Sequence, residues 1–133
     1  MSARGMEKAL VLALASSAGV HGALVPTHGA EAPLLGAMFA LSAPLLAGIA
    51  LRVDRAPGPL VLSVAVVLLA ALLAAYVVTR FVALPPVPHA EPVDLLGAAT
   101  KLIETGGLVL ALRLLGTRAG GAALPALHEG AGR

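Results

Sequence analysis

The chain has 133 residues and contains neither cysteine nor tryptophan, and only 12% of its residues are charged. The lack of cysteine excludes disulfides, thiolate metal sites, iron–sulfur clusters and cysteine nucleophiles. The net charge is only +2, and no basic stripe with interleaved aromatic residues is present. Nothing in the composition therefore indicates a nucleic-acid partner.

Hydrophobic residues make up 59% of the chain, and the charged fraction is about half of the ~25% that soluble domains carry. A helix needs about 20 apolar residues to cross a hydrocarbon core of ~30 Å. Four segments come close to this length and are separated by short stretches rich in turn-forming residues. They are residues 9–25, 34–51, 60–78 and 95–115. The sequence predicts an all-α fold: one integral membrane domain, 1–133, built as a four-helix up-down bundle.

We make two further predictions, one about the prolines in or next to these segments and one about the residues after the last segment. Pro26 marks either a kink or the end of the first helix, and Pro44 should kink the second. Residues 116–133 are rich in glycine and alanine and are expected to form a flexible cytoplasmic tail. A cleavable signal peptide is the alternative for the N-terminus, but the apolar run continues past the cleavage-like residues 13–15.

Basic residues predict the orientation. Lysine and arginine occur before the first span, between the second and third, and after the fourth, whereas the segments 26–33 and 84–94 contain neither. By the positive-inside rule, both termini and the middle loop are cytoplasmic. The alanine-, glycine- and leucine-rich composition suggests a GC-rich bacterium, and hence the bacterial cytoplasmic (inner) membrane.

Five polar residues interrupt or border the outer parts of the spans: His21, Arg80, Asp94, Lys101 and Glu104. Glu104 lies about ten residues after Asp94, so ~15 Å deep and near the bilayer midplane. A charge there costs at least ~2.5 kcal/mol, so it should face the bundle interior and find a partner. The i, i+3 spacing places Lys101 and Glu104 side by side. They form either a structural ion pair or a site for a ligand, a proton or an ion.

A metal site is a weaker hypothesis. Imidazole and carboxylate ligands together suit zinc, copper(II), iron or nickel. The candidate ligands come from three separate segments and show no tight ligand spacing: His21, His28, Glu31, His89 and Glu91. A haem held by two histidines is weaker still, because aromatic residues make up only 2% of this short chain. The serines in the spans have no base at readable spacing, so an enzyme is not favoured, and absence of any cofactor is the leading expectation.

Several short stretches together resemble a group of small four-helix membrane proteins from actinobacteria and other high-GC bacteria, for which no activity is established. They are VHGALVP at 20–26, EAPLLG at 31–36, YVVTRFVALP at 76–85, EPVDLLG at 91–97 and KLIE at 101–104. The resemblance covers roughly residues 11–115. It implies that the outer polar residues belong to the fold, and it brings no ligand, cofactor or activity with it.

Three functions remain open from the sequence. The first is an accessory or structural subunit, which packs within a larger membrane complex or against itself through small residues. The alternative is a carrier or binder of a small ion, solute or transition metal, with a polar site open to the outer side. A haem or redox protein, or an intramembrane enzyme, is the lesser alternative. In every case the lipid bilayer is the expected surrounding.

Overall fold

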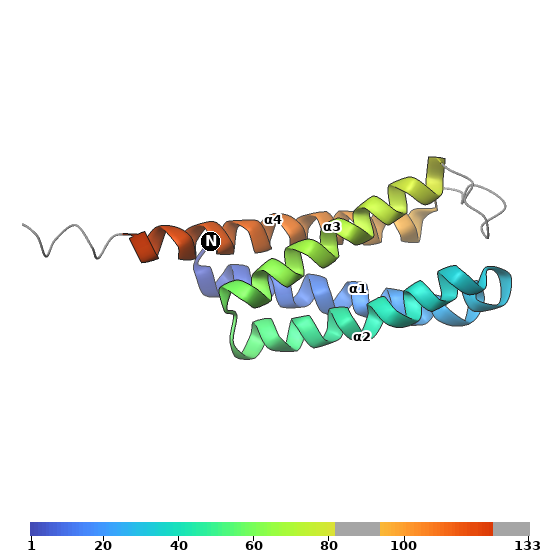
Figure 1. The fold of residues 1–133 in the computed structure, drawn as a ribbon, viewed down its shortest axis with the longest axis horizontal. Helices are drawn as coiled ribbons and strands as arrows, with labels where there is room; N and C mark the ends of the chain where they lie inside the picture. The colour runs from blue at the N-terminus through green and yellow to red at the C-terminus, as the bar shows by residue number, and fades with distance from the viewer. Residues whose placement is uncertain (82–93, 124–133) are drawn as a thin grey trace, which may run out of the picture.

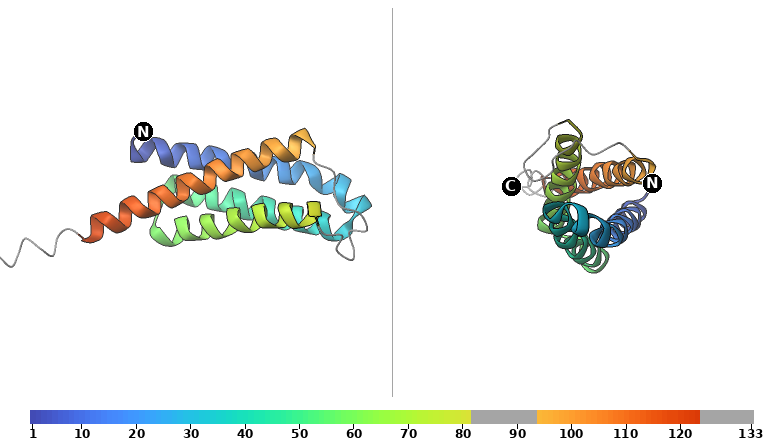
Figure 2. Two further views of the ribbon diagram at one scale, coloured as in Figure 1. Left: turned by 90° about the horizontal axis from the view of Figure 1, so that it is seen from above. Right: turned by 90° about the vertical axis from the view of Figure 1, so that its right-hand side faces the viewer.

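The computed structural model describes residues 1–81 and 94–123. These residues form four α-helices that lie side by side in one bundle (Figures 1 and 2). The helices are α1 (Ala3–Glu31), α2 (Pro33–Arg55), α3 (Pro59–Phe81) and α4 (Leu95–Ala123). Each is long and apolar enough to cross a membrane. For the described residues, the prediction of an all-α fold with four segments of membrane-spanning length is therefore confirmed.

Local sequence explains where the helices begin. The Ser2 hydroxyl accepts a hydrogen bond from the Gly5 N–H at 3.2 Å, and Asp94 Oδ1 accepts one from the Gly97 N–H at 2.6 Å. Both are N-cap bonds, which satisfy backbone donors that have no partner in the first turn. Proline opens α2 and α3, where its missing N–H costs nothing. A single residue, Ala32, separates α1 from α2.

The helices are longer than the apolar segments. Pro26 lies inside α1, which continues to Glu31, and Pro44 lies inside α2. Proline removes one backbone bond, but apart from a closed barrel only a helix satisfies the remaining backbone groups in lipid. Residues 116–123 of the expected flexible tail also belong to α4, because extending a formed helix is far easier than starting one. The rest of that tail, 124–133, lies outside the described residues.

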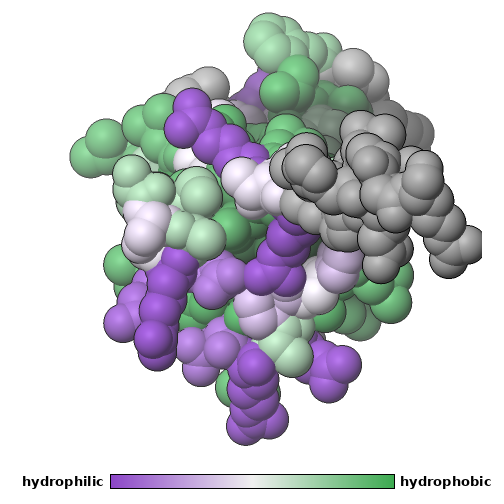
Figure 3. All heavy atoms as spheres, turned by 90° about the vertical axis from the view of Figure 1, so that its left-hand side faces the viewer, coloured by the Kyte–Doolittle hydropathy of each residue, from purple (hydrophilic) through white to green (hydrophobic). Residues whose placement is uncertain are grey.

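The two ends of the bundle differ in character. The N-terminus, the link between α2 and α3 and the last turns of α4 lie at one end, here called the N-terminal end (Figure 1). Hydrophilic side chains gather on this end (Figure 3). The exposed charged residues near it include Arg4, Lys8, Arg52 and Arg55. The opposite end holds the α1–α2 junction, the end of α3 and the start of α4.

The apolar core fills the half of the bundle nearer the N-terminal end. All four helices contribute to it, and most of its large side chains are fully buried. Its fully or nearly fully buried leucines and valine are Leu10, Leu14, Leu46, Val53, Leu62, Leu69 and Leu114. An ion pair between Arg118 Nη2 and Glu7 Oε1, 2.7 Å apart, joins α4 to α1 on the same side. The buried polar residues begin beside this core, at Ser17 next to the core residue Ala18, and extend from there toward the opposite end.

Candidate binding cleft

A buried carboxylate, Glu104, is the centre of a polar network. Its side chain is 0% exposed. Ser17 Oγ donates a hydrogen bond to Oε1 at 2.7 Å, and His21 Nε2 lies 3.1 Å from the same oxygen. Lys101 Nζ donates to Oε2 at 2.5 Å, as the i, i+3 spacing predicts. Both carboxylate oxygens are thus engaged, and the charge is balanced by an adjacent ammonium group.

His21 extends the network to α2. The ring is 3% exposed, and its Nδ1 lies 2.6 Å from Ser42 Oγ. The Ser42 hydroxyl is also 3.2 Å from the Phe39 carbonyl oxygen. If His21 is neutral, Nε2–H donates to Glu104 and the Ser42 hydroxyl donates to Nδ1. If it is protonated, Nδ1–H donates to Ser42, whose hydroxyl then donates to the Phe39 carbonyl. The same geometry satisfies both protonation states.

This network links three helices. Ser17 and His21 come from α1, Ser42 from α2, and Lys101 and Glu104 from α4. In a low-dielectric interior, a charged group is stable only when it is paired and fully hydrogen-bonded. The contacts of Glu104 with Ser17 and His21, and that of His21 with Ser42, join different helices and therefore depend on a particular register between them. The network fixes how α1, α2 and α4 face one another around these residues.

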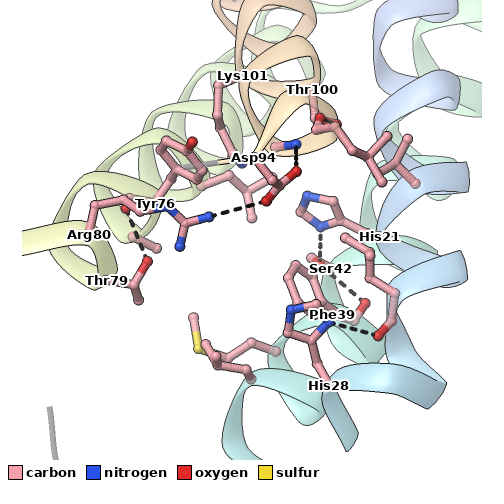
Figure 4. A pocket seen from close by; sticks show the side chains of 18 residues that line it. His21, His28, Phe39, Ser42, Tyr76, Thr79, Arg80, Asp94, Thr100 and Lys101 are labelled. Atoms are coloured by element: carbon pink, nitrogen blue, oxygen red, sulfur yellow. Dashed lines mark hydrogen bonds and ion pairs between the residues drawn. The ribbon is translucent and has the colours of Figure 1, made fainter. Parts of the chain in front are cut away.

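A cleft of about 150 Å³ adjoins the network, between the α1–α2 pair and the α3–α4 pair (Figure 4). Four of the five residues predicted to bind a ligand line it: His21, Arg80, Asp94 and Lys101. The fifth, Glu104, is directly hydrogen-bonded to Lys101 and in contact with His21. The structure thus brings all five together, although they come from α1, α3, α4 and the residue before α4.

The α3–α4 side of the cleft carries its charges. Arg80 Nη2 lies 3.9 Å from Asp94 Oδ2, and the Arg80 guanidinium lies over the Tyr76 ring at 4.3 Å from its centroid. Lys101 Nζ lies 5.4 Å from the centroid of the same ring. Both distances fall within the range of cation–π attraction. The Arg80 side chain is 12% exposed, whereas that of Asp94 is 58% exposed.

The α1–α2 side is mainly apolar and aromatic. Leu24, Leu35 and Met38 line it together with Phe39 and His28. The rings of His21 and His28 both pack edge-on against Phe39, with centroid distances of 5.2 and 4.9 Å. The cleft therefore has one charged wall and one mainly apolar wall, and Figure 4 shows His28 and Phe39 across a common space from Tyr76 and Arg80.

One ring nitrogen of His28 is within hydrogen-bond distance of a backbone carbonyl of its own helix. Its Nδ1 lies 3.2 Å from the Leu24 carbonyl oxygen, which can only accept, so Nδ1 carries a hydrogen. A neutral His28 then presents Nε2 as an acceptor.

Among residues 1–81 and 94–123, no group of three or more histidine or acidic side chains could hold a metal ion. The other ligands of the metal hypothesis, namely the Glu31 side chain, His89 and Glu91, lie outside the described residues.

Three residues of this region were not among the predicted site residues. Ser17 and Ser42 were considered as nucleophiles only, yet both supply hydrogen bonds to the buried network. Ser17 precedes His21 by four residues, which places both on one helix face, so spacing could have linked them. Ser42 and Tyr76 lie at the cleft only because their helices pack against α1 and α4. No pattern in the sequence links these two residues to the other site residues.

Comparison of the chain with models of known protein families, with curated proteins and with solved structures found no match. Function therefore has to be inferred from the chemistry of the cleft itself.

Proposed function

We propose that this chain is a small multi-pass membrane protein that binds a small solute in the cleft between its two helix pairs, as a carrier or a binder. The observation that carries this proposal is the lining of the cleft. Charged side chains of α3 and α4 face an apolar wall from α1 and α2 across a space of about 150 Å³. An engineered apolar cavity of about this size binds benzene, so a small organic molecule fits.

A purely structural ion pair would be closed off from any cavity. Glu104 fits that description, because it is 0% exposed and does not line the cleft. Lys101 does not fit it, because its side chain is 16% exposed and forms part of the cleft wall. We therefore assign Glu104 to holding Lys101 and His21 in place, and Lys101 to contacting the solute.

We further propose that the four helices cross the bacterial inner membrane in up-down order with both termini in the cytoplasm. The exposed arginine and lysine residues at the N-terminal end of the bundle support this orientation (Figure 3). The cleft then lies toward the outer side. The apolar core beneath it closes the path to the cytoplasm, so this conformation would receive a solute from outside.

Cysteine accessibility tests the proposal, because the chain has no cysteine of its own and any introduced thiol is unique. Ala75 lines the cleft, whereas its neighbour Ala74 is exposed on α3 and does not. Ala75→Cys and Ala74→Cys therefore place the same thiol at the same depth, one facing the cleft and the other facing lipid. The protein is reconstituted in liposomes and treated with a membrane-impermeant methanethiosulfonate, which reacts with thiolates in water.

We expect Ala75→Cys to be modified and Ala74→Cys to be protected. Equal protection of both thiols would mean that the cleft is closed to water, and the solute-binding proposal would be wrong. Introduced cysteines at the exposed residues Ala30 and Ala56, at opposite ends of the bundle, test the orientation in intact cells that express the protein. With both termini facing inward, only the thiol at position 30 reacts from outside.

A second function, that of an accessory subunit or a homo-oligomer, is favoured by a different surface. A shallow groove between α1 and α2 is lined mainly by small residues, among them Ala15, Gly19, Ala43 and Ala47. Small residues allow transmembrane helices to approach closely, so a helix of a second copy or of another subunit fits there. Light scattering of the purified protein, with Gly19→Leu as the variant, tests this: a dimer that the variant dissociates supports it, and a monomer contradicts self-association.

A further inference from the structure

We infer that the solute is a small organic anion, whose charged group lies against Arg80 and Lys101 and whose apolar part lies against Leu35, Met38 and Phe39. This inference rests on the cleft-binding function proposed above and names the chemical class that the cleft selects. It follows from the hydrogen-bonding capacity that the cleft residues leave unused.

Donors are in excess on the charged wall. A guanidinium has five N–H donors and an ammonium has three. Among residues 1–81 and 94–123, Arg80 makes no side-chain hydrogen bond: its closest carboxylate oxygen, Asp94 Oδ2, is 3.9 Å away, and its Nε has no partner. Lys101 donates to Glu104, which accounts for one of its three donors. The Arg80 guanidinium and the Lys101 ammonium therefore retain N–H donors that can bond to a ligand in the cleft.

The acceptors of the buried Glu104 carboxylate, by contrast, are already occupied; among the described residues, the acceptors left on the cleft lining include Asp94 Oδ2, 3.9 Å from Arg80 Nη2, and Nε2 of a neutral His28. Glu104 receives bonds from Ser17 and Lys101 and contacts His21. Asp94 Oδ1 caps α4 through the Gly97 N–H, and the Asp94 side chain remains largely exposed. A ligand that supplies acceptors to Arg80 and Lys101 completes the bonding of the wall, and a carboxylate does so with the geometry that a guanidinium prefers.

The aromatic residues do not form a site for an organic cation. The Tyr76 ring, which could attract one, already lies against the Arg80 guanidinium and near the Lys101 ammonium. Glu104 balances the charge of Lys101, whereas Arg80 has only the exposed carboxylate of Asp94 at 3.9 Å, so a cationic ligand at the Tyr76 ring would lie beside a weakly paired guanidinium, which repels it. The unused N–H donors of Arg80 on this wall therefore favour an anion over a cation of the same size.

The cleft volume sets the size of the ligand. About 150 Å³ matches a benzene-sized molecule, so a body of about six non-hydrogen atoms fills it. Butanoate is a suitable probe, because its carboxylate and short alkyl chain match the two walls. Butylammonium has a similar chain and the opposite charge, and butanol has no charge. Comparing the three separates the effect of charge from that of the alkyl chain.

The experiment uses Ala75→Cys in detergent and measures how each probe slows its modification by a small neutral methanethiosulfonate. We expect butanoate to protect the thiol at about millimolar concentration, as suits so small a ligand. Butylammonium should need at least tenfold more, and butanol should lie between them. If butylammonium protects as well as butanoate, the anion inference is wrong. The reaction of the thiol, and its protection by a probe, would still support the proposed binding function. If the thiol does not react at all, the proposed function itself fails.

Variants locate the anion site. Arg80→Gln should raise the protecting concentration of butanoate about tenfold or more, because a charge-assisted bond is lost. Arg80→Lys keeps the charge and should retain most of the protection, which also shows that position 80 tolerates substitution. Arg113→Gln changes an exposed arginine away from the cleft and is the matched control. Unchanged protection in Arg80→Gln would refute the assignment of the anion to Arg80.

The anion could be free in solution or could be the headgroup of an anionic lipid. Reconstitution in phosphatidylcholine alone, or with phosphatidylglycerol added, separates these sources. Protection by butanoate that is equal in both lipids indicates a free solute. Protection by phosphatidylglycerol without butanoate indicates a lipid headgroup. Absence of protection by either anion in both membranes would overturn the inference.

Discussion

Glu104 is the residue whose substitution tests the structure most directly. Glu104→Gln keeps the volume of the side chain, so it creates no cavity. It removes the negative charge that Lys101 faces at 2.5 Å, and it places an amide N–H₂ where one of the carboxylate oxygens accepted a bond. Breaking one side of a buried ion pair costs about 3–5 kcal/mol, because it leaves the other charge unpaired. Since Lys101 is partly exposed, we expect a loss at the lower end, about 3 kcal/mol.

The partner substitution should cost less. Lys101→Met leaves Glu104 with the bond from Ser17 and the contact with His21, so both remaining partners still contact Oε1 of the carboxylate. We expect it to reduce the free energy of unfolding by about 1–2 kcal/mol. The double variant carries neither charge. Its free energy of unfolding should therefore fall by less than the sum of the losses in the two single variants. The coupling energy between positions 101 and 104 should be about 2 kcal/mol.

Reversible unfolding in mixed micelles, followed by far-UV circular dichroism as the fraction of a denaturing detergent rises, measures these free energies. The four proteins of the double-mutant cycle are compared under identical conditions. If the two single substitutions add to within about 0.5 kcal/mol, Lys101 and Glu104 do not interact, and the description of the network is wrong.

Two further substitutions test other contacts. Gly36→Ala would place a Cβ where it overlaps the Cα of Gly29, so it should destabilise the α1–α2 pair by about 1–3 kcal/mol; Gly48→Ala meets nothing within 4 Å and should be neutral or slightly stabilising. Ser42→Ala leaves His21 Nδ1 without its partner and should cost about 1–3 kcal/mol, whereas Ser63→Ala, at an exposed position, should change stability by less than about 0.5 kcal/mol. Equal effects within either pair, measured by the same unfolding assay, would contradict the contact in question.

The sequence predicted the helices well because their signal is local. An apolar run of about 20 residues has only one common solution in lipid, since a helix satisfies every backbone group within the segment. The ends were less certain: α1 continues past Pro26 and α4 continues past residue 116. One missing backbone bond, or a run of glycine and alanine, weakens a helix without ending it.

The charged residues of the site were also found from sequence, for an energetic reason. A charge in an apolar span is energetically costly unless it has a partner, so Lys101 and Glu104 are identified from the sequence as candidates. Their spacing on one helix predicted their contact. Ser17 and Ser42 did not stand out, because a hydroxyl in a helix can bond to its own backbone and so costs little.

The sequence by itself therefore determined the four helices, the cost of the charges within them and the pairing of Lys101 with Glu104. The tertiary structure alone decided that His21 bridges Glu104 and Ser42, that Arg80 and Lys101 flank the Tyr76 ring, and that an apolar wall faces them across a cleft. Helix formation and contacts within one turn depend on neighbouring residues, whereas these relations depend on the rotation and packing of whole helices against one another, which no local pattern specifies.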